Sequence, residues 1–347
     1  MKRTKMTRGL GMVVLLLVAI AFQVACTREH AKDQKPANGL FPLKTITMKD
    51  CSLAPWLVAE RNGYFKDEKI QIVYTGETQQ ALIIPSILNG DNDVSGAHPN
   101  TLAVAKASGA KITGVVRGVI DPPPDVDPRF RHMFWYVNPK KYPNVKTFAD
   151  LKNLQGRLKF STITANICAD FLANRLADKY GIPRDKFEWV TMPDIQAIQA
   201  LKQGLIDVAG VHPPFYKGMD DNGALKIADS SESGLGAAAG VAYYFFTDKF
   251  IREHPAVVEG FVRAMNRSGA WLNAHPDQGA QWVSDVIGVP VTGNHYYATK
   301  NDVPESELEP WIQDLEDSKV IPKGKIKPSD LVTHQFETHE EFALLKK

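Results

Sequence analysis

The sequence predicts an α/β protein of two related lobes, in which parallel or mixed sheets are flanked by helices. Three observations point to this class: short β-type runs alternate with helical runs, a ten-residue pattern occurs twice, and 347 residues suffice for about two domains. Apolar residues make up 44% and charged residues 23%, so disordered, collagen-like and disulfide-scaffold chains are excluded.

The first 25 residues have the layout of a secretory signal. Four basic residues precede an apolar stretch from Leu10 to Phe22, which at 13 residues is too short to span a bilayer comfortably. Val24-Ala25-Cys26 follows and resembles a bacterial lipobox, so Cys26 is expected to be the lipidated first residue of the mature chain. Gln23 departs from the apolar residue that is usual there, and a plain cleaved signal or an uncleaved anchor is the alternative.

The mature chain has no charge signature of a nucleic-acid partner. Removing the leader's four basic residues from the 41 lysines and arginines leaves 37 against 39 acidic residues, a net charge of −2. Residues 26–43 are polar and are predicted to form a flexible tether. The sequence therefore predicts an extracytoplasmic protein, in the periplasm or at the cell surface, that a lipid anchors to a bacterial membrane and that binds no nucleic acid.

Lobe 1 is expected to span residues 44–137. Its strands are predicted at 45–48, 70–74, 93–97, 112–119 and 133–137, and its helices at 54–64, 79–88 and 100–107. Four prolines between Asp121 and Pro128 exclude a helix or a central strand there, so this segment is predicted to be an ordered surface loop. Because strands alternate with helices, parallel pairing is expected.

Lobe 2 is expected to span residues 138–244, and residues 245–347 are expected partly to pack back on lobe 1. Strands are predicted at 158–161, 187–191 and 207–211, and helices at 165–180, 194–203, 255–274, 304–317 and 337–347. The acidic side chains of residues 304–317 are interpreted as a solvated helix face. The two crossings between the lobes, near residues 119–132 and 230–243, are candidate hinges.

The pattern G-x-x-D-V-x-G-x-H-P occurs at residues 90–99 and again at residues 204–213, with six identities at a constant offset of 114. Each copy runs from a predicted strand into a helix, and ligands bind beyond such strand ends in α/β sheets. Proline suits the first helical turn, so His98 and His212 are expected near N-caps, where free N–H groups favour an anion. If the lobes face each other, both histidines line one gap. The plainer alternative is a pair of turn residues retained from a duplication.

The two cysteines of the predicted lobes raise the question of a metal. Cys51 follows the first predicted strand and Cys168 lies in a predicted helix, so they could join His98 and His212 around zinc or a softer metal. No pair has the close spacing typical of metal ligands, so no metal site is predicted and buried inert thiols are expected. A Cys51–Cys168 disulfide would lock a moving cleft and is not expected. Since no phosphate-binding loop, G-x-S-x-G or H-E-x-x-H motif occurs, no cofactor is expected.

Five segments resemble motifs of one protein family. Residues 54–65 resemble a helix that ends in A-x-x-x-G-Y-F, and residues 88–94 resemble an L-x-x-G-x-x-D motif. Residues 145–156 resemble the motif S-V-A-D-L-K-G-K with two inserted residues. Residues 203–208 and 213–215 resemble a G-x-V-D-A motif that is followed by proline and phenylalanine. Together they are similar to the periplasmic solute-binding proteins of ABC importers for sulfonates, nitrate, taurine and thiamine-precursor pyrimidines, over about residues 44–270. Residues 211–215 read V-H-P-P-F where that family often has a tryptophan and a carboxylate, which leaves the ligand open.

The resemblance implies a two-lobed Venus-flytrap fold of the type II periplasmic-binding-protein class. It implies a monomer without catalytic activity that captures a small organic solute, expected to be anionic and sulfonate-like, in an interlobe cleft and delivers it to an ABC permease with its ATPase. The alternatives are a binder of a thiamine-precursor pyrimidine or another aromatic solute, and a ligand sensor. A pyrimidine-synthase-like enzyme is disfavoured because the sequence has no cysteine-rich cluster.

The candidate ligand-binding residues are polar or aromatic and lie at predicted strand ends and helix starts. Hydroxyl, amide and backbone N–H groups there suit an oxyanion, and the aromatic rings could contact a flat or apolar ligand. The candidates are Cys51, Ser52, Trp56, Thr78, Gln79, His98, Asn100, Thr162, Thr164, Asn166, Asp194, His212 and Phe215. The competing interpretation is helix capping for the polar members and core packing for the aromatic ones.

Overall fold

The computed structural model describes residues 39–339 except Asp50 and Thr292, and Leu40–Lys347 forms one compact unit. The expected signal at residues 1–25, the lipidation site Cys26 and the tether up to residue 38 lie outside the described residues. So do residues 340–347 of the last predicted helix, whose described part is not helical. None of the described helices is both long and apolar enough to cross a membrane.

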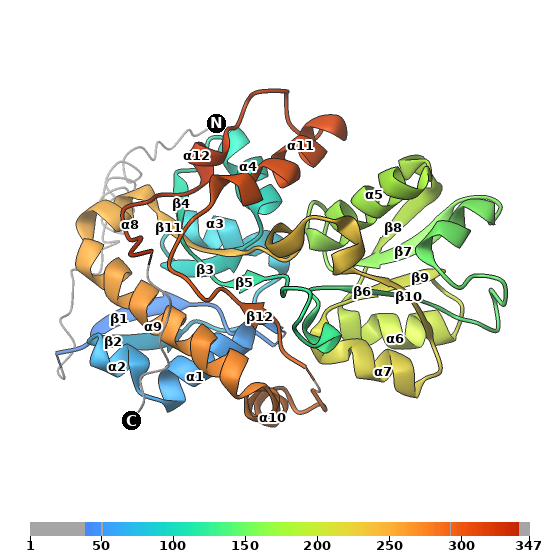
Figure 1. Cartoon of the computed structure of the whole chain (residues 1–347). Coiled ribbons are helices and arrows are strands. Elements are labelled where there is room, and N and C mark those ends of the chain that lie inside the picture. Colours follow the sequence, from blue (N-terminus) through green and yellow to red (C-terminus); the bar gives the residue numbers. More distant parts are fainter. Residues whose placement is uncertain (1–38, 50, 292, 340–347) are drawn as a thin grey trace, which may run out of the picture. The chain divides into compact units, whose positions relative to one another are not determined.

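Two small sheets are built mainly from the N-terminal part of the chain (Figure 1). In one, β1 (Phe41–Thr45) pairs in parallel with β2 (Ile70–Tyr74). In the other, β11 (Tyr243–Thr247) lies between β3 (Val94–Ala97) and β4 (Ile112–Arg117) and is antiparallel to both. The expected parallel pairing is wrong for this second sheet because a strand from much later in the chain inserts between β3 and β4.

Helices pack around these two sheets (Figure 1). They are α1 (Ala54–Arg61), α2 (Tyr64–Asp67), α3 (Ile83–Leu88), α4 (Pro99–Ala107), α8 (Asp248–Glu253), α9 (Pro255–Ala274), α10 (Pro276–Ile287), α11 (Glu309–Asp317) and α12 (Pro328–Leu331). α9 has the predicted bounds, because it begins at a proline and buries Val258, Phe261, Val262 and Met265 on one face. The first strand was predicted at residues 45–48, but β1 begins earlier and spans Phe41–Thr45. Residues 41–43, the last three residues of the predicted tether, therefore belong to the fold.

The other sheet has five strands in the order β10-β6-β9-β7-β8. They are β6 (Phe134–Val137), β7 (Leu158–Thr162), β8 (Phe187–Thr191), β9 (Val208–Val211) and β10 (Leu225–Asp229). β7 is parallel to β8 and β9, whereas β6 is antiparallel to β9 and β10. β6 ends the segment expected to form lobe 1, but it pairs with strands of the segment expected to form lobe 2.

Helices cover both faces of the five-stranded sheet. Figure 1 shows α5 (Cys168–Tyr180) on one face, with α6 (Asp194–Lys202) and α7 (Tyr216–Asp221) on the other. The four side chains of β6 are all buried for this reason: Phe134 packs with residues of α6 and α7, and Trp135 packs in the core on the α5 side. Helices therefore flank this mixed sheet, as the predicted α/β class requires.

Short 3-10 helices join many of these elements. They are η1 (Cys51–Leu53), η2 (Gln80–Leu82), η3 (Pro128–Phe130), η4 (Phe148–Asn153), η5 (Arg184–Lys186), η6 (Pro213–Phe215), η7 (Ser230–Ser233), η8 (Gly236–Ala239) and η9 (Glu305–Glu307). The acidic segment at residues 304–317 divides into η9 and α11, and it is not merely a solvated face. Glu307 pairs with the buried Arg117 of β4 at 2.7 Å, and Asp314 pairs with Arg184 at 2.8 Å.

The two copies of the repeated pattern have the same role in their sheets. Asp93 accepts a hydrogen bond from the backbone N–H of Lys44 at 2.8 Å, and Asp207 accepts one from the backbone N–H of Lys159 at 2.8 Å. Each carboxylate thus joins the start of its own strand to a neighbouring strand. The strand of each copy then leads directly to a histidine.

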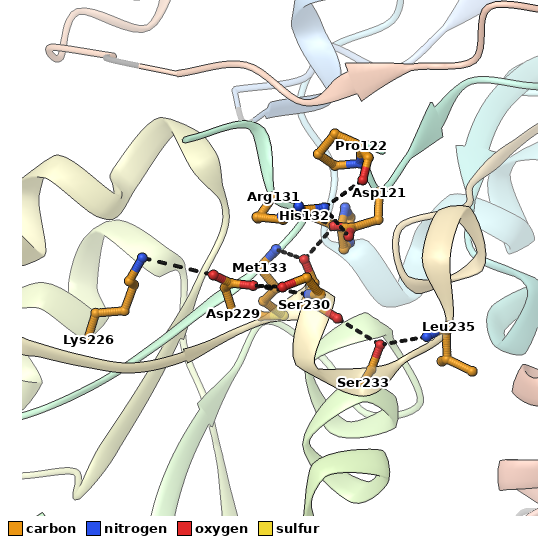
Figure 2. Close-up of polar contacts among 11 residues, drawn as sticks. Asp121, Pro122, Arg131, His132, Met133, Lys226, Asp229, Ser230, Ser233 and Leu235 are labelled. Atoms are coloured by element: carbon orange, nitrogen blue, oxygen red, sulfur yellow. Dashed lines mark hydrogen bonds and ion pairs between the residues drawn. The ribbon is translucent and has the colours of Figure 1, made fainter. Parts of the chain in front are cut away.

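Asp121 ties together the two crossings predicted near residues 119–132 and 230–243 (Figure 2). Its buried carboxylate accepts hydrogen bonds from the backbone N–H of His132 at 2.8 Å and from the hydroxyl of Ser230. In the first crossing, β5 (Val119–Ile120) also pairs with β12 (Tyr296–Tyr297). The position of His132 is therefore set by contacts within and between the crossings.

Candidate ligand-binding site

A cavity of about 610 Å³ is lined by residues from both parts of the fold. Segments within residues 46–56, 77–83 and 95–101 line one side, and segments within residues 163–167 and 191–195 line the other. The volume lies in the range of pockets that bind small organic molecules. This cavity is the strongest candidate for a binding site among the described residues.

Nine of the thirteen predicted ligand-binding residues line the cavity. They are Ser52, Trp56, Thr78, Gln79, His98, Thr164, Asp194, His212 and Phe215. The side chain of Cys51 lies outside the described part of the structure. Binding by any of these residues stays a prediction, but the fold brings most of them to one place.

The other three predicted residues organise the loops beside the cavity. The Thr162 hydroxyl donates to the carbonyl of Thr164 at 2.7 Å. Asn166 has a left-handed backbone with φ of 56°, and its N–H donates to the carboxylate of Asp170 at 2.7 Å. Asn100 is buried, and its side-chain oxygen accepts from the N–H of the next residue at 2.9 Å. The left-handed residue also explains why α5 begins at Cys168 and not at residue 165.

The aromatic candidates combine core packing with a place in the cavity wall. Trp56 is fully buried, with its ring centroid 5.5 Å from that of Phe261 and 5.8 Å from that of Tyr244. Phe215 is 8% exposed and belongs to the core around α6 and α7. Core packing therefore accounts for most of the area of both rings.

Among the polar candidates, helix capping does not account for Gln79. Gln79 precedes η2, is exposed, and makes no side-chain capping hydrogen bond. Thr78 beside it is exposed as well. Asp194 is different, because its buried carboxylate accepts from both the backbone N–H of His212 at 3.0 Å and the ring Nδ1–H of His212 at 2.6 Å.

Four histidines and one cysteine form a cluster at the wall of the cavity. We call the side chains of His98, His132, His212, His295 and Cys168 the His–Cys cluster. Ring centroids are 5.0 Å apart for His98 and His132, 5.3 Å for His132 and His212, and 4.8 Å for His132 and His295. The Cys168 thiol is fully buried, with its Sγ 3.1 Å from Nε2 of His212.

The repeated turns place two of these rings. His98 precedes α4 and His212 precedes η6, and both have extended backbone without capping through the side chain. Nδ1–H of His98 donates to the carbonyl of Val241 at 2.8 Å, and Nδ1–H of His212 donates to Asp194. These two bonds orient each ring, and the ring of His212 turns its Nε2 toward Sγ of Cys168, 3.1 Å away.

Burial and mutual proximity shift the pKa values in the His–Cys cluster strongly. Burial of Cys168 opposes ionisation, but the imidazoles of His98 and His212 outweigh it and lower the pKa of the thiol to about 6. Burial likewise opposes the charging of His212, but Asp194 and the thiolate raise its pKa well above the usual value. Burial and the neighbouring rings lower the pKa values of His132 and His295 well below the usual range.

His132 and His295 were not among the binding residues predicted from the sequence. Both lie next to apolar or aromatic residues, in His-Met-Phe-Trp from residue 132 and in Asn-His-Tyr-Tyr from residue 294. A histidine in such a stretch is a sign of a buried ring, which needs a reason to be there. Neither residue shares a motif with His98 or His212, so only the fold reveals that the four rings meet.

Several solved structures share this fold. The periplasmic aliphatic sulphonate-binding protein SsuA from Escherichia coli is 15% identical over 88% of this chain and 96% of its own, with a TM-score of 0.64. The periplasmic nitrate-binding protein NrtA from Synechocystis PCC 6803 is 11% identical over 84% of this chain and 85% of its own, with a TM-score of 0.68. These likenesses show that the chain has the periplasmic-binding-protein fold.

A third structure is the alkanesulfonate-binding protein SsuA from Xanthomonas axonopodis pv. citri bound to MOPS. It is 15% identical over 84% of this chain and 98% of its own, with a TM-score of 0.64. A search of curated protein sequences found no match. The model of the NMT1/THI5-like family matches residues 51–279, about two thirds of the sequence, and the chain therefore belongs to the NMT1/THI5-like family.

Proposed function

We propose that this protein is the extracytoplasmic solute-binding component of an ABC importer, which captures a small organic solute and delivers it to a permease with its ATPase. The observation that carries the proposal is a cavity of about 610 Å³ whose wall comes from both parts of the fold, next to the two crossings. Family membership and the fold shared with sulphonate- and nitrate-binding proteins support it. The protein has no catalytic activity of its own in this proposal.

The proposed molecule is a monomer of two lobes that close over the solute. In this proposal, lobe 1 contains the sheets β1-β2 and β3-β11-β4 with the later residues packed on them, and lobe 2 contains the five-stranded sheet. β6 therefore lies on the other side of the lobe boundary expected at residues 137/138, and β11 spans the boundary expected at residues 244/245. A secretory signal at residues 1–25 is removed, Cys26 receives a lipid, and the predicted tether up to residue 40 joins the fold to the membrane. The sequence supports this arrangement through the lipobox-like ending Val24-Ala25-Cys26.

The proposed solute is a small organic anion of the sulfonate type. A charged His212 ring in the wall would favour an anion, and the exposed Thr78 and Gln79 offer a hydroxyl and an amide for its oxygens. The second candidate is an aromatic solute such as a thiamine-precursor pyrimidine. The apolar part of the wall, which includes Trp56 and Phe215, favours that candidate.

Thermal unfolding of the purified mature chain against a panel of alkanesulfonates, nitrate and aminopyrimidines tests the proposal. A solute at 100 times its Kd adds about 2.7 kcal/mol of stability by mass action, which raises the melting temperature by several degrees. Compaction in small-angle scattering should accompany the shift if the lobes close. The class that shifts the protein most decides between the two candidates, and no shift by any class would contradict solute capture.

Two exposed side chains provide a matched pair of variants for this experiment. Ile195 lines the cavity and is 43% exposed, whereas Leu205 is 61% exposed and does not line it. Ile195→Asp places a charge in the cavity and should abolish the shift caused by an anionic solute. Leu205→Asp makes the same kind of change elsewhere and should leave the shift intact. Equal responses of both variants would show that the solute binds outside this cavity.

A further inference from the structure

Three side chains of the His–Cys cluster bring metal-binding atoms to one point. The ligand atoms of His98, His132 and Cys168 all lie within 4.8 Å of one another. An ion with ligand distances of about 2.0–2.3 Å holds neighbouring tetrahedral donors roughly 3.3–3.8 Å apart. Rotamer adjustments of about 1 Å would therefore bring these three donors into contact with one ion.

Hydrogen bonds to neighbouring groups orient the histidine rings in the way that is usual at metal sites. Histidines that bind metals usually donate their second ring N–H to a carbonyl or a carboxylate. Nδ1–H of His98 donates to the carbonyl of Val241, so Nε2 is the ring atom that could bind an ion. Beside it, His212 donates Nδ1–H to Asp194 and holds Nε2 at 3.1 Å from Sγ of Cys168.

His132 provides the independent observation that points to a ligand. The ring is 1% exposed, and neither of its nitrogens has a hydrogen-bond partner among the described residues. A buried polar group without a hydrogen-bond partner destabilises the fold, so native structures rarely leave one unexplained. Figure 2 shows the carboxylate of Asp121 accepting from the backbone N–H of His132, which fixes the position of this residue. An ion between His132, His98 and Cys168 would supply the missing partner.

We propose that His98, His132 and Cys168 bind a transition-metal ion of the Zn²⁺ or Cu⁺ class. Two imidazole nitrogens and a thiolate suit these borderline or soft ions, whereas Mg²⁺ and Ca²⁺ require oxygen ligands. The fourth position falls to His212 or to a molecule in the cavity, because His98, His132 and His212 also line the cavity. Asp194 acts here as a positioning residue, because it orients the ring of His212 beside Cys168. This inference goes beyond solute capture and does not depend on it.

Direct titration with Zn²⁺ tests the site in the full mature chain. One equivalent should bind in competition with a chromophoric chelator, and X-ray absorption should show one sulfur at about 2.3 Å and nitrogens at about 2.0–2.1 Å from zinc. Anaerobic titration with Cu⁺ against a Cu⁺-specific chelator is the second arm. Failure of both ions to bind, or a zinc shell without sulfur, overturns the proposal. The thermal-unfolding panel tests solute capture without added metal, so solute capture and metal binding can each fail without the other.

Variants identify the ligands. Cys168→Ser and His132→Gln should weaken Zn²⁺ binding by about 100-fold or more, while Asp194→Asn should weaken it by about tenfold because it removes only an orienting hydrogen bond. His334→Gln is the control, because His334 is exposed and outside the cavity. Circular dichroism without metal checks the folding of each variant, and the half-buried His98→Gln replaces any variant that does not fold. Wild-type affinity in Cys168→Ser or His98→Gln would contradict the assignment.

Discussion

At the scale of single residues, the repeated aspartates show how one role is filled in two environments. Asp207 accepts from the Lys159 backbone, from Tyr142 and from the Lys141 ammonium at 2.6 Å. Burial alone would raise the pKa of Asp207, but these partners outweigh burial and lower it. Asp93 has fewer partners, so burial dominates and raises its pKa. The same sequence motif therefore yields carboxylates with opposite pKa shifts.

Asp207→Asn should destabilise the protein at neutral pH by about 1.5–3 kcal/mol, because it removes charge-assisted hydrogen bonds to Lys141 and to the backbone. A carboxylate with a lowered folded-state pKa stabilises the fold above its unfolded-state pKa, and this contribution is lost as pH falls through the folded-state pKa. The difference from wild type should thus shrink below about pH 4. Urea unfolding at pH 7 and pH 3 measures it. The exposed Asp185→Asn is the control and should be neutral at both pH values.

The residue scale also shows how far the candidate site could be predicted. His98 and His212 were found because a duplication left them in matching motifs, and the structure places both at one cavity. His132 and His295 lie in segments that are not part of the repeated pattern. His132 directly precedes β6, and His295 precedes β12, which pairs with β5 of the first crossing. A site assembled from such segments has no spacing signal in the sequence. The metal site was therefore not predicted, although two of its three proposed ligands, His98 and Cys168, were named.

At the scale of elements, the crossings explain most of the differences between expectation and structure. Strands with strong β-type runs, such as β2 and β8, have their predicted bounds. The sequence predicts no strand at β10 or β11, and it predicts only a crossing near residues 230–243 between them. Pairing with β6 and with β3 and β4 makes these segments strands, and such long-range contacts override local propensity.

Gly240 marks the tightest contact between the two crossings. A Cβ on Gly240 would lie 2.7 Å from the Asp121 nitrogen, 2.8 Å from the Ile120 carbonyl carbon and 2.9 Å from Cβ of His132. Backbone atoms cannot yield easily, so Gly240→Ala should destabilise the protein by about 1–3 kcal/mol. Zn²⁺ affinity should fall as well, because the new methyl group displaces His132.

Gly96→Ala is the matched control for Gly240→Ala. Its Cβ would meet only the Tyr244 ring, at an ordinary 3.7 Å, so stability and Zn²⁺ affinity should change little. Thermal unfolding and zinc titration of both variants give the comparison. Equal melting temperatures for the two variants would show that the crossings can separate without cost.

At the scale of the whole molecule, α11 joins the C-terminal segment to both parts of the fold. Trp311 is fully buried, with its ring stacked 4.0 Å from Phe171 of α5 and 5.1 Å from His98. Its indole N–H donates to the carbonyl of Ala238 in the second crossing at 2.9 Å. Trp311 of α11 therefore packs against α5 and against His98 of the His–Cys cluster.

The buried carboxyl of Asp314 on α11, which pairs with Arg184 at 2.8 Å, gives this connection a pH dependence. Burial raises the pKa of Asp314 to about 6, although Arg184 and Asn174 act in the opposite direction. A carboxyl whose pKa is higher in the folded than in the unfolded state binds more protons when folded, so stability falls as pH rises between about 4 and 6. Asp314→Asn resembles the protonated form and should lack this slope. Its stability relative to wild type should therefore improve by up to about 3 kcal/mol from pH 4 to pH 7.

Urea unfolding of wild type and Asp314→Asn across pH 4 to 7 measures the effect. The exposed Asp317→Asn on the same helix is the control and should follow wild type at every pH. If Asp314→Asn also parallels wild type, the ion pair with Arg184 must hold the folded-state pKa of Asp314 near its unfolded value. The stability that Asp314 contributes would then not depend on pH, and any pH dependence of solute or metal binding would have to come from groups in the cavity. If the slope disappears in Asp314→Asn alone, mild acid strengthens the contact of α11 with α5, and binding at the cavity should be measured at a fixed pH above 6.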